Sequence, residues 1–141
     1  MLRLEEPLID WLKGVPGLLG VYSTADLGDF EKAGKPAPCV AVVYDGYAVV
    51  EARRTSRAVR IETRWLVILV VRHAARAAGA PARSPAAEDL IEELLQRLLA
   101  WTPPDGFTPL ELATPPAPVF QAGASFYPLA VTTQSVIEPA R

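Results

Sequence analysis

Residues that commonly do chemistry in proteins are few in this sequence, and they are not grouped. His73 is the only histidine and Cys39 the only cysteine, and neither Ser23 nor Ser125 lies in a motif that would activate a nucleophile. A metal centre needs three or four converging cysteine, histidine or carboxylate ligands. The sequence therefore predicts no catalytic, cofactor-binding or metal-binding residues. A small hydrolase that uses His73 remains the weakest alternative.

Two further features have a simple structural interpretation. The run Gly14-Val15-Pro16-Gly17-Leu18-Leu19-Gly20 superficially resembles a phosphate-binding loop. It lacks both the lysine that follows a P-loop and the strand that precedes a dinucleotide-binding loop, which favours a turn. Cys39 lies between Pro38 and Val40 at the start of an apolar run, so we expect it to be a small buried hydrophobe.

The charged residues are distributed unevenly. Residues 51–83 contain eight arginines and two glutamates, a net charge of +6, whereas the whole chain carries -2 and the remainder therefore -8. A basic segment beside acidic flanks can bind an anionic partner or a second copy of the same chain. An exposed hairpin end that is merely solvated by its arginines explains the pattern equally well.

The acidic counterpart of this basic segment is the solvent-exposed face of a helix expected from Ser84-Pro85 to about Trp101. Because spacing of four residues places like charges near one another, this face costs stability unless a basic partner lies opposite. We therefore expect self-assembly contacts between an arginine group and an acidic group: Arg53, Arg54, Arg57 and Arg60 with Glu88, Asp89, Glu92 and Glu93. The planar arginine side chain suits such contacts because it can bind a carboxylate through two parallel hydrogen bonds.

The arginines are positioned by the clearest β pattern in the sequence, residues 57–73. Val59, Ile61, Thr63, Trp65, Val67, Leu69 and Val71 alternate on one face. The other face is apolar in the middle and charged at its ends, so we expect the middle to be covered on both faces. The end at Arg57–Arg64 should project beyond the core as a β-hairpin, with Arg53–Arg60 poorly packed inside its own protomer. Before it, Asp45-Gly46 separates two apolar runs; this predicts a hairpin turn there, with a bulge in one long strand as the alternative.

The remaining elements follow from periodicity and from proline. The pattern predicts helices from about residue 4 to 13 and from Ser84-Pro85 to about Trp101, with short strands at 20–23, 107–113 and 119–120 and a last strand at 126–136. Pro128 suggests that the last strand lies at an edge or begins there. The apolar stripe of the second helix is Leu90, Ile91, Leu94, Leu95, Leu98 and Leu99. We expect Leu90, Ile91, Leu94 and Leu98 to share one core with Trp65, Val67 and Leu69.

Length and composition limit the architecture. The 141 residues predict one domain over 1–141, and a 50% hydrophobic content with 21% charged residues excludes a wholly disordered chain. One cysteine fits a reducing compartment, and neither a membrane span nor a signal peptide is expected. The fold class is α+β: a mixed, mostly antiparallel sheet with two helices packed on it and a projecting β-hairpin.

The order of short motifs resembles that of a known family. The motifs are Leu12-Lys13 before Val15-Pro16-Gly17, Val21-Tyr22-Ser23, Val42-Val43-Tyr44-Asp45-Gly46-Tyr47, Arg64-Trp65-Leu66-Val67 with Val71-Arg72, Leu98-Leu99-Ala100-Trp101, and Phe126-Tyr127-Pro128-Leu129-Ala130. Together they cover nearly the whole chain and resemble the Mu-like phage tail proteins, which are similar in turn to the tail-terminator proteins of long-tailed phages. None of these motifs fixes an individual functional residue.

That resemblance implies an α/β or α+β fold, no enzymatic activity and no cofactor. It also implies a homo-hexameric ring that caps the tail tube, ends tube polymerisation and offers a surface to the head-tail connector protein. The chain would be made in the host cytoplasm and finish in the virion tail. The alternative from the residues is a monomeric binding module whose arginine-rich hairpin binds an anionic ligand or nucleic acid. Nucleic acid is disfavoured because only Trp65 accompanies the basic segment, on its apolar face.

Overall fold

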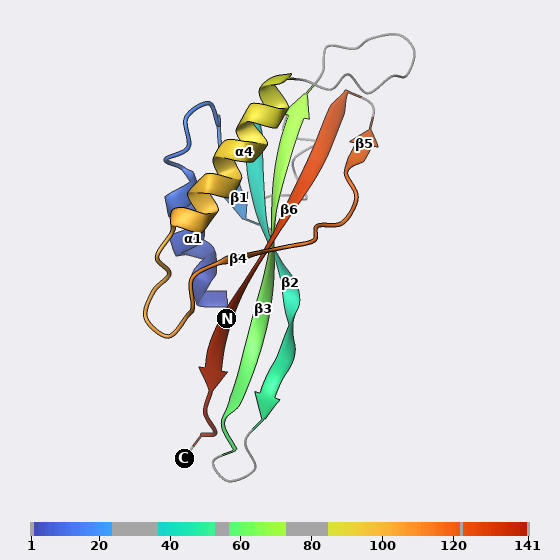
Figure 1. Cartoon of the computed structure of the whole chain (residues 1–141). Helices are drawn as coiled ribbons and strands as arrows, with labels where there is room; N and C mark the ends of the chain where they lie inside the picture. Colours follow the sequence, from blue (N-terminus) through green and yellow to red (C-terminus); the bar gives the residue numbers. More distant parts are fainter. Residues whose placement is uncertain (1, 24–36, 53–56, 73–84, 122, 141) are drawn as a thin grey trace.

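The computed structural model of the chain describes residues 2–23, 37–52, 57–72, 85–121 and 123–140. Within these residues the elements in chain order are η1 (Leu2–Leu4), α1 (Glu5–Leu12), β1 (Val21–Ser23), β2 (Cys39–Ala52), β3 (Val59–Arg72), α4 (Pro85–Ala100), β4 (Glu111–Ala113), β5 (Val119–Gln121) and β6 (Ala124–Ile137). The strands form one six-stranded sheet. Figure 1 shows that β2, β3 and β6 are much longer than the region covered by the helices.

The sheet is mixed but mostly antiparallel. Its strand order is β1-β2-β3-β6-β4, with β5 also paired to β6, and only the β1–β2 pair is parallel. The central strand β3 pairs with β6 over all fourteen of its residues without a register shift. Two helices on such a sheet confirm the α+β class expected from the sequence.

Both helices pack on one face of the sheet. On β3 this is the face that carries Trp65, Val67 and Leu69. Leu8 and Leu12 of α1 and Leu94 and Leu98 of α4 are buried in one cluster with Trp65. Val67 and Leu69 belong to the same cluster, and Leu90 and Ile91 pack against it partly buried. The expected core is therefore confirmed.

The opposite face of β3 is covered less than expected. Leu66 and Ile68 are half-buried there, whereas Val70 is buried with Cys39 in a smaller cluster. That cluster contains residues of strands and no residue of α1 or α4. Among the described residues, then, the helices form a layer on one side of the sheet only.

Asp45-Gly46 is not a turn, so the predicted hairpin at this position is wrong. The two apolar runs are halves of one strand, β2, and the register with β3 shifts between Tyr44 and Tyr47. Gly46 has φ of +89°, a conformation that suits a β-bulge as well as a tight turn. The alternative of one long bulged strand is what the chain adopts. The actual hairpin joins β2 to β3.

The helix α4 begins at Pro85 as predicted, but its apolar stripe is narrower than expected. Leu94 and Leu98 are fully buried, whereas Leu99 is 51% exposed. Since residues repeat every 100° around a helix, Leu99 lies about 100° further round than Leu98, on the outer side. The prediction that Leu99 belongs to the core face is wrong.

In the last third of the chain, the first strand is shorter than predicted and the last strand, β6, is longer. Only Glu111–Ala113 of the expected strand 107–113 pairs as β4, whereas β6 extends to Ala124–Ile137. The β5–β6 connection contains Gly123, whose φ of +81° fits the turn expected there.

Pro128 is buried inside β6, an inner strand, rather than at its start. Gln134 receives a hydrogen bond from Thr108 N–H and donates its own N–H to Thr108 Oγ1, so its backbone points away from β3. Backbone groups alternate sides along a strand, which points the Pro128 nitrogen the same way. There it lies between the segments of β6 that pair with β5 and with β4. The missing N–H therefore breaks no strand pairing.

Candidate assembly surfaces

The residues considered for catalysis do not form a reaction centre in the described part of the chain. Cys39 is 1% exposed and Ser125 fully buried, so the expectation of a buried structural cysteine is confirmed. The described residues contain no group of three or more His, Cys, Asp or Glu side chains able to hold a metal ion. His73 lies outside the described residues. The glycine run forms the turn that follows α1, with Gly17 at φ +89°.

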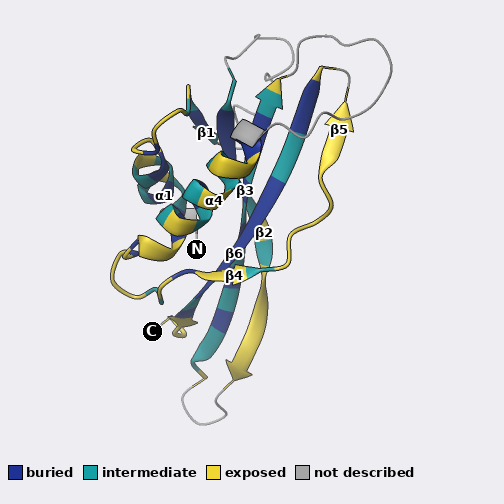
Figure 2. Cartoon of the chain, turned by 45° about the horizontal axis from the view of Figure 1, so that its top comes forward, coloured by how far each residue is buried: buried dark blue, intermediate teal, exposed yellow. Residues whose placement is uncertain are grey.

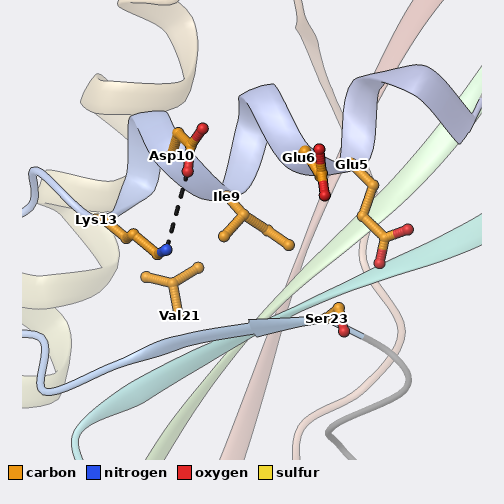
Figure 3. A pocket seen from close by; sticks show the side chains of 7 residues that line it. All are labelled: Glu5, Glu6, Ile9, Asp10, Lys13, Val21 and Ser23. Atoms are coloured by element: carbon orange, nitrogen blue, oxygen red, sulfur yellow. Dashed lines mark ion pairs between the residues drawn. The ribbon is translucent and has the colours of Figure 1, made fainter.

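One cavity of about 540 Å³ lies between α1 and β1. Figure 3 shows its lining side chains, which are Glu5, Glu6, Ile9, Asp10, Lys13, Val21 and Ser23. Lys13 Nζ lies 3.8 Å from Asp10 Oδ1, and both side chains are largely exposed. The lining thus combines the carboxylates of a solvated helix face with the short strand β1.

The lower halves of β2, β3 and β6 project beyond the helices and form a three-stranded arm. Its free end lies where β2 ends and β3 begins (Figures 1 and 2). Tyr47 and Val49 of β2 are 59% and 60% exposed, and Ile137 of β6 is 47% exposed. The projecting hairpin expected from the sequence is therefore present, widened by β6 to three strands.

The basic end of the arm is only partly described. Arg57 is exposed, with φ of +59°, as expected for a residue poorly packed in its own protomer. Arg60 is half-buried and pairs across the strands with Glu51. Arg53 and Arg54 lie outside the described residues. Further up the arm, Arg64 donates to Asp45 Oδ2 and to the Thr114 carbonyl, both at 2.8 Å, which ties the β2 bulge to the chain after β4.

The acidic group lies on α4. Glu88, Asp89 and Glu92 are exposed and Glu93 is half-buried. The first three belong to the first half of the helix and Glu93 follows directly after it; Figure 1 places this part of α4 toward the end of the sheet opposite the arm tip. Within one chain the structure therefore does not bring Arg57 or Arg60 to the carboxylates.

The apolar residues of the arm were missed by sequence reasoning. Tyr47 pairs with Thr63, and Val49 with Ile61, so both lie on the same face of the sheet as Trp65. With a turn at Asp45-Gly46, Tyr47 and Val49 would belong to a separate strand and would not continue the strand that pairs with residues 59–70. The available signal was the unbroken β-branched character on both sides of Asp45-Gly46.

The arm and the exposed acidic face of α4 are the two prominent surface features of the described residues. The family model described as phage tail terminator protein matches residues 4–141, and the chain belongs to this family. The chain is thus a structural, non-enzymatic component of a phage tail, of the family whose members end the tail tube. The resemblance drawn from the motifs is confirmed, and the hydrolase alternative is wrong. No curated protein matches the chain.

Proposed function

We propose that copies of this chain form a closed ring, a homo-hexamer, on the end of the tail tube. The ring stops addition of tube protein and presents its outer side to the head-tail connector protein. Synthesis takes place in the host cytoplasm, and the finished ring remains in the virion tail. The proposal extends the tail-terminator family membership of the chain.

The observation that carries the proposal is the separation of two unlike surfaces on one protomer. The arm tip with exposed Arg57 and the acidic half of α4 lie at opposite ends of the sheet (Figure 1). A ring is built from heterologous contacts, in which one surface of each copy meets a different surface of the next copy. A protomer with an exposed arginine on one surface and exposed carboxylates on a different surface provides the two unlike surfaces that such a contact requires.

The test combines assembly with the tube protein of the same phage. Electron microscopy of tubes grown with and without this chain should show capped tubes of limited length only when the chain is present. Light scattering of the chain alone and of the capped tubes then gives the number of copies. Capped tubes that carry one copy would overturn the ring.

The competing binding module predicts a different result. A monomer that binds DNA with an affinity falling steeply as salt rises would support that alternative. Its weakness is that Trp65 is fully buried and so cannot stack on a base.

A further inference from the structure

We propose that the apolar face of the arm is covered by the outer side of α4 from a second copy of this chain. The inference rests on the proposed ring and names the two surfaces that meet in it. The apolar arm face is defined by Tyr47, Val49, Val59 and Ile137, and the α4 stripe by Glu88, Glu92 and Leu99.

The apolar arm face continues the core face of the sheet past the end of the helices. Val59 pairs with Ala52 on one side and with Ile137 on the other, in the same phase as the Val49–Ile61 pair. Tyr47, Val49 and Ile137 are about half exposed or more, at 59%, 60% and 47%. Tyr47 and Val49 are neighbours on one face of β2, whereas Ile137 lies on β6 beside Val59, and Ile61 of β3 between them is already buried at 3%. Exposed apolar side chains grouped on one face of a sheet mark a surface that a partner covers.

The α4 stripe has the complementary composition. Residues 88, 92 and 99 fall within about 40° of one another around the helix at 100° per residue, on the side away from buried Leu94 and Leu98. Glu88 and Glu92 are exposed, and Leu99 is 51% exposed. The stripe therefore presents carboxylates at its start and an apolar side chain near its end.

The two surfaces match in spacing and in charge. Ile61, opposite Val49, is four residues from Arg57, at most about 13 Å at the rise of a strand, because β3 begins only at Val59. Leu99 is about 10 Å along the helix from Glu92 and about 16 Å from Glu88, at 1.5 Å per residue. A helix laid along the arm with its start toward the tip puts Leu99 on Val49 while a carboxylate reaches Arg57. The reverse orientation would place the carboxylates on apolar residues, and burying a charged group without a partner is unfavourable.

This arrangement selects among the basic residues of the tip. Arg60 alternates with Val59 and Ile61, so it lies on the opposite face of the sheet, where it pairs with Glu51 and Val136. The contact with the second copy therefore falls to Arg57, and Arg60 provides a control of equal charge three residues away.

The first test is a cross-link between copies. Val49→Cys protein is mixed with Leu99→Cys protein, and oxidation is carried out on the concentrated mixture and on tails assembled with it. Cys39 is 1% exposed and stays unreactive. We expect a disulfide-linked heterodimer of these two variants at least tenfold more abundant than the one obtained when Val119→Cys, at a position 49% exposed on β5, replaces Leu99→Cys. Equal yields, or cross-linking of Val49→Cys only to itself, would overturn the proposal.

The second test is a charge reversal with rescue, read out by sedimentation or light scattering. Arg57→Glu should weaken association at least tenfold, Arg60→Glu should have a much smaller effect, and Glu92→Arg added to Arg57→Glu should restore most of the loss. If both arginine variants assemble like the unchanged chain, the pairing is wrong. Tubes that are still capped by a ring in that case leave the proposed function standing, whereas tubes that no copy caps contradict the proposed function itself.

Discussion

Trp11 and Arg97 hold the two helices together through reciprocal contacts. Trp11 Nε1 donates to the Arg97 carbonyl at 2.8 Å, and Arg97 Nη2 donates back to the Trp11 carbonyl at 3.1 Å. The guanidinium carbon also lies 3.9 Å from the centre of the indole ring. The last turn of α1 and the last turn of α4 are thereby fixed to each other as well as to the sheet.

Replacing Arg97 by methionine keeps most of the aliphatic stem and removes the guanidinium. We expect a loss of about 1–3 kcal/mol in the free energy of unfolding, because a cation–π contact and hydrogen bonds to a partly buried carbonyl disappear. Urea unfolding followed by tryptophan fluorescence measures the loss. Arg97→Lys keeps the charge but not the planar guanidinium, so its free energy of unfolding should lie between those of the unchanged chain and Arg97→Met. A loss below about 0.5 kcal/mol for Arg97→Met would show that the sheet alone positions the helices.

Leu94 and Leu99 provide a test of which side of α4 is the core side. Leu94→Ala should cost about 2–5 kcal/mol because it leaves a cavity beneath a fully buried position. Leu99→Ala should change the stability of the monomer by no more than about 0.5 kcal/mol. Thermal or urea unfolding of both variants at low protein concentration checks this. A Leu94 variant that loses under about 1 kcal/mol would mean that the helix packs elsewhere.

Thr63 and Thr133 face each other across β3 and β6 and should respond oppositely to valine. Thr63 Oγ1 is buried with no hydrogen-bond partner among the described residues, so Thr63→Val should stabilise the protein by about 1 kcal/mol. Thr133 Oγ1 donates to the Thr108 carbonyl at 2.6 Å, and Thr133→Val should cost about 0.5–1.5 kcal/mol. Calorimetry of the two variants under one set of conditions compares them. Destabilisation by both would contradict the assignment of Thr63 as unsatisfied.

The Asp45–Arg64 ion pair is exposed, with side chains 43% and 32% accessible, so its contribution should be small. Asp45→Ala should lower stability by less than about 1 kcal/mol at low salt. In about 1 M salt, where charges are screened beyond about 3 Å, the variant and the unchanged chain should differ still less. Chemical denaturation with urea, which is uncharged, keeps the ionic strength under control. A larger cost that salt does not reduce would show that Asp45 holds the bulge by means other than charge.

The alternation in residues 57–73 and the helical stripe around Leu94 sufficed to predict the core, because burial follows directly from those periodicities. Asp45-Gly46 did not suffice: the same positive-φ glycine serves a turn or a bulge, and the continuous pairing of β2 with β3 decides between them. Pro128 misled for a related reason. A lost N–H matters only where another strand pairs on the side to which it points, and β5 and β4 pair with β6 before and after Pro128 but not at it.

The surfaces were predictable in part. Arg57 and the acidic side of α4 follow from charge and periodicity, and both are exposed. The projection of the Arg57 end beyond the core also followed from the charged ends of the strand pattern, whereas the placement of the acidic half of α4 at the other end of the sheet depends on how α4 packs, which no local pattern encodes. Predicting the apolar arm face would also have required the register of β2 against β3.

The central position of β3 has a mechanical consequence. Its fourteen residues extend about 45 Å at the rise of a strand, with β6 bonded along one side without interruption and β2 along the other. A force applied along this strand loads the flanking hydrogen bonds in shear, so many of them must fail together. The tip is therefore stiffly coupled to the helical layer, and tension applied at one end of the protomer is delivered to the other with little stretch.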